Sequence, residues 1–243
     1  VRRAKEEIAW QKDVRGFHVE WLDQPDVLKV EPRTNPECLG ASYAQGTGAI
    51  EAYRYNLAAA QAAEKFGAEF LLRRVTGLLS QGGRCTGVTL ENGQLEVGAV
   101  VLAVGPWSQQ AAGWCGVKLP VSPLKGQVVR LQLTTDPMRA SLNYDGSYAA
   151  SKPDGLIWAG TTEEEAGFEE GTTSEARDSI MADFMKMIPG MDDAELVQQT
   201  ACLRPLSADG MPIVDRVTGW DNLFVATGAG RKGILWSTGM AQA

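Results

Sequence analysis

The spacing of hydrophobic and polar residues predicts three helices, two in the first third of the chain and one in the second half. Residues 1–12 and 51–66 carry apolar side chains at helical spacing, and Gly67 follows the second segment as a helix stop. A third helix is predicted to open with the capping box of Thr172 and Glu175. It ends where Pro189 and Gly190 interrupt the pattern.

Between residues 69 and 104 the sequence predicts three short strands and one continuous apolar strand. Segments 69–75, 85–90 and 94–97 read as short strands, the last two joined across Asn92 and Gly93 in a type I′ hairpin. The run AVVLAV at 99–104 is apolar without alternation. This pattern is typical of a strand that is buried on both faces of a parallel sheet.

From residue 125 to 160 the pattern changes to alternating strands, in the segments QVVRLQLTT, GSYAAS and LIWAGT. Alternation predicts an antiparallel sheet with one solvated face. The stretch from Pro25 to Pro36 is predicted to be irregular, and a last strand at 223–227 leads into a glycine-rich turn and a helical tail. The predicted fold class is therefore mixed, α/β together with α+β.

Composition and charge exclude several classes of protein. The 243 residues include 30 acidic and 23 basic ones, a net charge of -7, with 44% hydrophobic and 22% charged residues, as in soluble globular proteins. Without a cluster of Lys and Arg, no nucleic-acid partner is expected. The longest charge-free apolar stretch, 97–107, is far shorter than the roughly 20 residues of a membrane span. With no signal segment, the sequence predicts a cytoplasmic protein.

Cysteine and histidine contribute little to the predicted chemistry. The four cysteines form no C-x-x-C pair, so neither a metal site nor a dithiol centre is predicted. His18 is the only histidine, and it stands in a charged opening segment, which argues against a Ser-His or Cys-His site. The chain starts at Val1 without an initiator Met and stops within a helical pattern, so we expect an internal fragment.

Two segments could form a binding site. The glycines at 228–233 follow a predicted strand and precede a helix, so this loop could cradle a phosphate or let the backbone approach a flat ligand. Arg204 precedes Pro205, which favours an extended backbone. An arginine held on such a segment suits bidentate binding of a carboxylate, and the alternative is a surface arginine or a salt bridge.

Five motifs in order carry a resemblance to a known family. They are VVLAVGPWS, PLKGQ, SYAASKPDGLIWAGTT, CLRPLSADGMPIVD and NLFVATGAGRKGILWS. This series resembles the FAD-dependent D-amino-acid-oxidase-like superfamily, above all its glycine oxidases, with sarcosine oxidases and D-amino-acid dehydrogenases as relatives. The resemblance implies an enzyme that uses FAD to oxidise the C–N bond of a small amine or amino acid by hydride transfer, with a homo-oligomer as a further option.

The pattern of the strands switches twice along the chain, which predicts two interleaved domains. Residues 47–118 and 204–243 would form part of a Rossmann-like FAD-binding layer. Residues 1–46 and 119–203 would form a substrate domain built on an antiparallel sheet. Members of the family carry an N-terminal nucleotide-binding unit upstream of the matching region, so the fragment is expected to lack it.

Site residues follow from the same resemblance. Arg204 would pair with the substrate carboxylate, Tyr148 would hydrogen-bond it, and Arg231 would stand beside flavin and substrate. The residues expected to bind the cofactor are Val75, Ala103, Gly105, Trp107, Gly228, Gly230, Arg231, Lys232, Gly233, Ile234 and Leu235.

Two positions of this sequence bear on the choice between a glycine-oxidase type and a sarcosine-oxidase type. Sarcosine-oxidase relatives have a lysine four residues after the position of Arg231, where this chain has Leu235, and this favours the glycine-oxidase type. Cys202 stands where those relatives attach flavin covalently, and a buried packing cysteine is the alternative. A sarcosine-oxidase-like enzyme, a D-amino-acid dehydrogenase and an inactive fragment without cofactor stay open.

Overall fold

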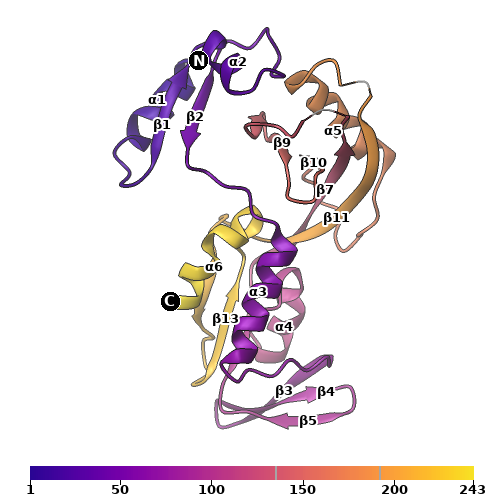
Figure 1. Cartoon of the computed structure of the whole chain (residues 1–243). Helices are drawn as coiled ribbons and strands as arrows, with labels where there is room; N and C mark the ends of the chain where they lie inside the picture. The colour runs from indigo at the N-terminus through magenta and orange to yellow at the C-terminus, as the bar shows by residue number, and fades with distance from the viewer. Residues whose placement is uncertain (135, 192) are drawn as a thin grey trace. The chain divides into compact units, whose positions relative to one another are not determined.

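The computed structural model describes residues 1–134, 136–191 and 193–243, so the end of the predicted strand QVVRLQLTT, Thr135, lies outside the described residues. The chain forms two compact units. Unit 1 consists of residues 1–55, 127–162 and 171–201, and unit 2 of residues 56–126, 163–170 and 202–243. Figure 1 shows the elements of both units.

Unit 1 opens with two helices and a two-stranded sheet. Helix α1 (Arg2–Gln11) precedes β1 (His18–Leu22), α2 (Gln24–Val30) and β2 (Ala41–Gln45), and β1 pairs with β2 in antiparallel fashion. The predicted irregular stretch from Pro25 to Pro36 is therefore partly wrong. Pro25 lies in the first turn of α2, where its missing N–H breaks no helical hydrogen bond.

The larger sheet has the strand order β11-β7-β10-β9-β8. Its strands are β7 (Val121–Gln132), β8 (Leu142–Tyr144), β9 (Ser147–Ser151), β10 (Ile157–Gly160) and β11 (Glu195–Ser207). The predicted antiparallel sheet is confirmed, because β10 pairs antiparallel with both β7 and β9. Strands β7 and β11 each have residues in both units.

Helix α5 (Ser174–Met187) covers the apolar side chains of this sheet. Ile180 and Phe184 pack in one buried cluster with Val129 and Ile157. The N-cap is Thr173, whose hydroxyl accepts a hydrogen bond from Ala176 N at 3.3 Å. The predicted cap, Thr172, is off by one residue, because the extended backbone of a cap is found at Thr173.

Unit 2 contains a three-stranded sheet in the order β12-β13-β6. Its strands are β6 (Val100–Leu102), β12 (Ile213–Arg216) and β13 (Leu223–Thr227), and β6 pairs with β13 in parallel fashion. The 3-10 turn Gly105–Trp107 and helix α4 (Ser108–Cys115) follow β6. The predicted strand at 99–104 is confirmed, but its burial on both faces is wrong, since Val101 is 60% exposed at the edge of the sheet.

A second small sheet in unit 2 consists of β3 (Val75–Gln81), β4 (Arg84–Leu90) and β5 (Gly93–Glu96). The predicted hairpin between β4 and β5 forms. Its type I′ turn is wrong, because Gly93 has a positive φ of 128° whereas Asn92 does not. The strand predicted at 69–75 is also wrong, because pairing with β4 begins only at Val75.

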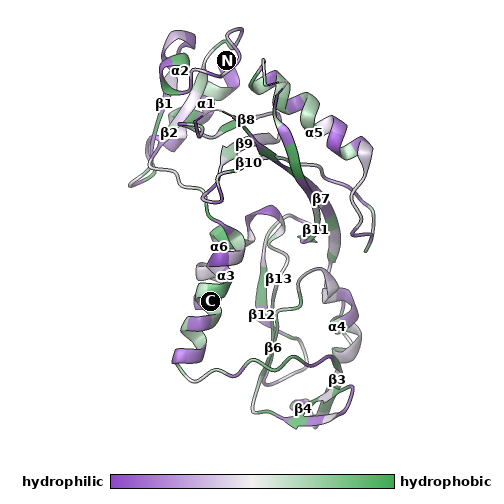
Figure 2. Ribbon diagram, turned by 45° about the vertical axis from the view of Figure 1, so that its right-hand side comes forward, coloured by the Kyte–Doolittle hydropathy of each residue, from purple (hydrophilic) through white to green (hydrophobic). Residues whose placement is uncertain are grey.

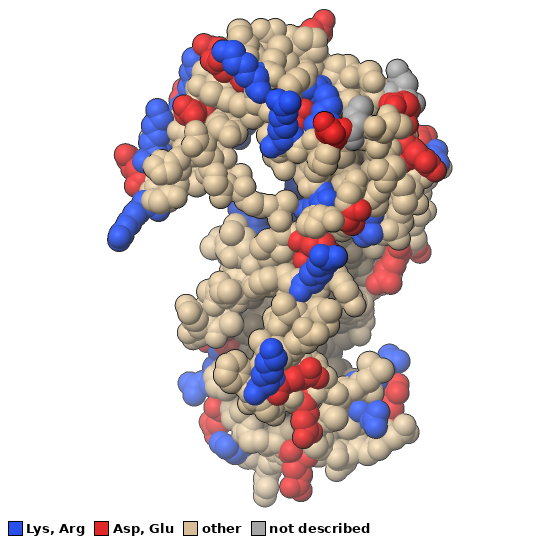
Figure 3. All heavy atoms as spheres, in the orientation of Figure 1, with Lys and Arg blue, Asp and Glu red and all other residues tan. Residues whose placement is uncertain are grey.

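Helix α3 (Ala52–Lys65) confirms the predicted helix at 51–66, and Gly67 has the left-handed φ of a helix stop. None of its described residues is buried. Among the described helices, none is both long and apolar enough to cross a membrane. Figure 3 shows Lys and Arg interspersed with Asp and Glu on the face in view.

Candidate functional site

The glycine-rich loop of unit 2 leads from β13 into helix α6 (Gly233–Gln242). Gly228 and Gly230 have positive φ angles of 79° and 51°, and a Cβ on Gly228 would lie 3.1 Å from Ser207 Cβ. Both the backbone conformation and the space therefore favour glycine. The first turn of α6 contains no acidic residue, which leaves the positive end of the helix dipole uncompensated.

A buried hydrogen-bond network fixes the start of this loop. Ser108 and Thr227 are at most 3% exposed, and their hydroxyls lie 2.7 Å apart. The carbonyl oxygen of Gly105 completes the network as an acceptor, 2.5 Å from Ser108 Oγ and 3.3 Å from Thr227 Oγ1. The ends of β6 and β13, from which two segments of the predicted site depart, are thereby joined.

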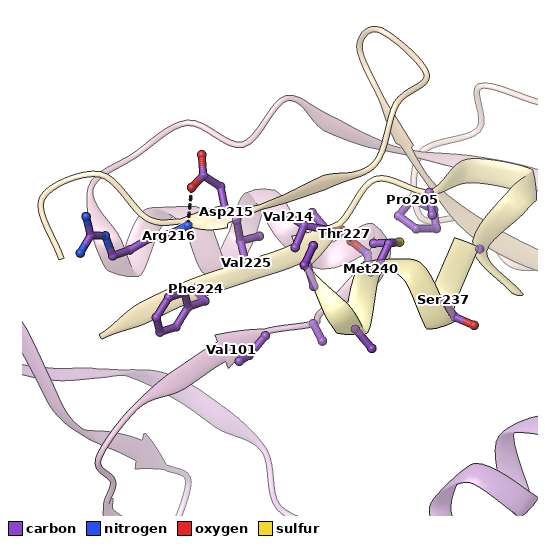
Figure 4. A pocket seen from close by; sticks show the side chains of 17 residues that line it. Val101, Pro205, Val214, Asp215, Arg216, Phe224, Val225, Thr227, Ser237 and Met240 are labelled. Atoms are coloured by element: carbon purple, nitrogen blue, oxygen red, sulfur yellow. Dashed lines mark hydrogen bonds between the residues drawn. The ribbon is translucent and has the colours of Figure 1, made fainter. Parts of the chain in front are cut away.

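One pocket of unit 2, of about 830 Å³, lies between this sheet and α6 (Figure 4). Its floor is apolar, with Val101 from β6 and Phe224 from β13, and Met240 of α6 also lines the pocket. Three predicted cofactor-binding residues line it: Ala103, Gly105 and Gly233.

A second pocket, of about 1030 Å³, brings together four of the predicted cofactor-binding residues: Val75, Ala103, Gly105 and Trp107. Arg73 and Arg74 also line this pocket, and Arg74 Nη1 lies 3.7 Å from Glu91 Oε1. Ala103 and Gly105 line both pockets, so the turn after β6 stands between the two spaces.

Arg204 lies in β11, the neighbour of β7, and is half-buried. Its guanidinium group packs directly on the buried backbone of Gly126 in β7. The predicted extended backbone of Arg204 is thus observed. The same segment is longer than expected, because β11 continues through Pro205 to Ser207.

Segment 163–170 of unit 2 holds Arg231 by an ion pair. Glu163 Oε1 lies 3.2 Å from Arg231 Nη1. Glu164 Oε2 lies 3.6 Å from Nζ of the buried Lys125, and the two backbones form a β-bridge. Phe168 stacks on Trp107 with a ring separation of 6.2 Å.

The remaining predicted residues lie in two places. Tyr148 is in β9 of unit 1, in register with Gly160 of β10, and half-buried. Lys232, Ile234 and Leu235 stand at the start of α6, where Lys232 Nζ lies 5.2 Å from the Trp236 ring. Of the three predicted catalytic residues, Arg204 and Arg231 therefore belong to unit 2 and Tyr148 to unit 1.

Sequence reasoning missed several side chains of this region. Lys125 is 2% exposed, although lysine is normally a surface residue, and only its place in the PLKGQ motif could have marked it. Glu163 and Phe168 lie in a segment without any recognisable motif. Over the described ranges, no cluster of three His, Cys, Asp or Glu side chains could hold a metal ion.

Comparison with known proteins identifies the family. The DAO family profile, described as FAD dependent oxidoreductase, matches residues 1–243. The chain belongs to this family. Its profile extends over both units, so the likeness is not confined to the glycine-rich loop.

Two curated relatives and one solved structure illustrate the similarity. The glycine oxidase of Pseudomonas putida is 33% identical over 169 residues, which are 70% of this chain and 46% of the relative. Hydrogen cyanide synthase subunit HcnC of Pseudomonas aeruginosa is 30% identical over 239 residues, 97% of this chain and 57% of the relative. The crystal structure of glycine oxidase from Geobacillus kaustophilus superposes with a TM-score of 0.91 at 25% identity, over 98% of this chain and 64% of that one. This chain thus spans about half the length of the curated relatives.

The residues of unit 2 fit the cofactor of the family. Gly228 and Gly230 place backbone without side chains beside Ser207 and Leu206, which a flat ring system requires. Arg231, Lys232 and the start of α6 supply positive charge suited to an anionic group. FAD is the cofactor that the family uses.

Proposed function

We propose that the whole protein oxidises the C–N bond of a small amino acid, in the manner of a glycine oxidase. The observation that carries the proposal is the placement of Arg204. Its forked end is held against the backbone of a buried strand, in the L-R-P motif on which the family resemblance rests. A guanidinium held in this way suits the two oxygens of a carboxylate.

The flavin, when bound, supplies the acceptor for a hydride from the substrate carbon. Arg204 binds and orients the substrate through its carboxylate, and this orientation matters more than a proton-transferring side chain. Arg231 stands in the glycine-rich loop, where the ion pair with Glu163 fixes its position and offsets part of its charge. The single histidine, His18, lies exposed in β1 and has no part in the proposal. Tyr148 remains a prediction from the resemblance.

Steady-state kinetics of the full-length flavoprotein with glycine test the role of Arg204. We expect Arg204→Ala to raise KM about 10- to 150-fold, because a charge-assisted pair to a carboxylate contributes roughly 1.5–3 kcal/mol. Arg204→Lys should recover part of the loss, since an ammonium lacks the bidentate fork. Arg84→Ala, an exposed arginine of the same unit, serves as the control. Unchanged kinetics of Arg204→Ala would contradict a role of Arg204 in substrate binding.

A dehydrogenase that passes electrons to an acceptor other than oxygen is the second candidate. The D-amino acid dehydrogenase of Rhizobium rhizogenes is 28% identical over 244 residues, which are 95% of this chain and 58% of the relative. Oxygen uptake and reduction of a dye such as dichlorophenolindophenol, measured on the same preparation, distinguish the two. Hydrogen peroxide formed in proportion to glycine consumed supports an oxidase, and turnover with the dye alone supports the dehydrogenase.

Substrate choice separates the proposal from a sarcosine-oxidase-like enzyme. Leu235, which stands at the start of α6, replaces the lysine of those relatives and is 74% exposed. Glycine should therefore be oxidised at least as well as sarcosine. A cytoplasmic location, a small amine or amino acid as the substrate partner and a homo-oligomer as a further option belong to the same proposal.

A further inference from the structure

We propose that Gly126 is a positioning residue for Arg204: the missing side chain at Gly126 creates the space in which the guanidinium adopts its carboxylate-binding orientation. The inference deepens the proposed function and depends on it.

The contact between the two residues is direct. Gly126 is buried in β7, and Arg204 lies in the hydrogen-bonded neighbour, β11. A Cβ built on Gly126 would overlap Nη1, Nη2 and Cζ of Arg204, the three atoms that form the fork. Of the described glycines, this is the one whose Cβ would meet a guanidinium. Any side chain at position 126 therefore displaces the end of Arg204 that binds a carboxylate.

Backbone conformation does not explain this glycine. Gly126 is absent from the glycines with positive φ, so alanine can adopt its backbone angles. Glycine inside a strand even weakens the strand, because it leaves more conformational freedom to lose on folding. The contact with Arg204 is the feature that requires the smallest side chain here.

The arginine, and not the strand, would move to accommodate a methyl group. The backbone N–H and C=O groups of Lys125 are both hydrogen-bonded to Glu164. Lys125 N donates to Glu164 O at 3.0 Å, and Glu164 N donates to Lys125 O at 2.9 Å. The ion pair of the Lys125 ammonium with Glu164 holds the same point. The guanidinium, in contrast, is the far end of a flexible side chain. Gly126→Ala should thus cost substrate binding and leave folding intact.

A double-mutant cycle tests this inference in the full-length flavoprotein, with the variants Gly126→Ala, Arg204→Ala and the two combined. The readouts are KM and kcat for glycine and the Kd of acetate, titrated through the flavin absorbance. We expect Gly126→Ala to raise KM and the acetate Kd at least about tenfold with a smaller change in kcat, because the fork is displaced. In the Arg204→Ala background it should change neither constant. Gly98→Ala, where a Cβ would meet nothing within 4 Å, is the matched control.

Two outcomes would overturn the inference. Equal fold-changes in both backgrounds would show that the methyl group acts on something other than Arg204. Loss of folding in Gly126→Ala and in the double variant alike, seen by thermal unfolding, would show that backbone excludes the methyl group. Failure of the proposed function is distinguishable, because Arg204→Ala alone would then leave KM and the acetate Kd unchanged.

Discussion

The large sheet of unit 1 and the three-stranded sheet of unit 2 differ in what covers their apolar side chains. In unit 1, α5 closes the sheet, and Val129, Ile157 and Phe184 are at most 3% exposed. In unit 2, helix α4 covers one side of β6 and β13, while Val101 and Phe224 on the other side line the pocket of Figure 4. Figure 2 colours most of β13 as hydrophobic, although only one side of this strand is buried.

A hydrophobic sequence pattern indicates that a strand has apolar surroundings. It does not indicate whether these surroundings are a core or a binding pocket. The run AVVLAV at 99–104 predicts burial on both faces, and one of those faces forms the pocket floor. Ligand pockets are lined mostly by apolar side chains, so both environments select the same residues. Substitution of the same residue type in both sheets can distinguish a core position from a pocket position.

The largest effect is expected for Phe184→Ala. Phe184 is fully buried between α5 and the sheet, so its truncation should lower the free energy of unfolding of unit 1 by about 3–5 kcal/mol. Phe224→Ala is the matched variant in the other sheet. Because Phe224 is already 39% exposed, we expect a loss of about 1 kcal/mol or less. Urea unfolding and hydrogen exchange of peptides from α5 and β13 measure both effects in the 243-residue chain.

A loss at Phe224 equal to that at Phe184 would contradict the assignment of this face to a pocket. Hydrogen exchange supplies the local control, because Phe184→Ala should release amides of α5 and β10 and leave those of α4 protected. General deprotection throughout both units would mean that the sheets do not unfold independently.

The sequence predicts those elements whose signals are local. Helix α3 is followed by a glycine stop, α5 has a threonine cap, and β13 is a five-residue apolar strand, and all three form where expected. Of β11, the sequence predicts only the extended backbone of Arg204 before Pro205. The strand continues through Pro205, because a proline is compatible with the edge of a sheet, where β11 lies.

The candidate site was only partly predictable, because only some of its residues carry a local sequence signal. Glycines in the 228–233 loop and Arg204 could be found because they belong to motifs. The partners of these residues could not, since Arg231 and Glu163 lie 68 residues apart and only the folded chain brings them together. The contact of Gly126 with Arg204 likewise depends on strand order, which no local pattern contains.

A smaller effect is expected at Glu31, the buried carboxylate that joins two segments of unit 1. Its Oε1 accepts a hydrogen bond from Arg33 Nε at 2.7 Å, and its Oε2 one from Arg139 N at 2.7 Å. Glu31→Gln removes the charge and one acceptor, so we expect a loss of about 1.5–3 kcal/mol of stability. Glu37→Gln, at an exposed position, is the control.

The pH dependence of unit 1 follows from the same residue. Burial raises the pKa of Glu31, but the hydrogen bonds from Arg33 and Arg139 outweigh it, so the folded-state pKa lies below the ordinary value of about 4.3. The carboxylate therefore contributes stability above that value, and the contribution is lost as the pH falls through the folded-state pKa. Urea midpoints between pH 7 and pH 3 should fall less steeply for Glu31→Gln than for the parent chain. An identical pH dependence of the urea midpoint in both chains would show that Glu31 does not contribute to the pH dependence of stability.

The smallest effect concerns the covered side of the sheet in unit 2, where Cys115 belongs to the α4 core. Burial raises the pKa of the Cys115 thiol, which leaves less of the reactive thiolate, and the buried Cys85 is equally inaccessible to reagents. Cys202 is exposed and Cys38 half-buried. With 5,5′-dithiobis(2-nitrobenzoate) at pH 8, Cys202 should react first and Cys38 second, whereas Cys85 and Cys115 should react only when urea unfolds the chain. Cys202→Ser removes the fastest phase and thereby assigns it. Rapid labelling of Cys115 in the native chain would show that the side of the sheet under α4 is as open as the pocket side, and the contrast between the two units would then disappear.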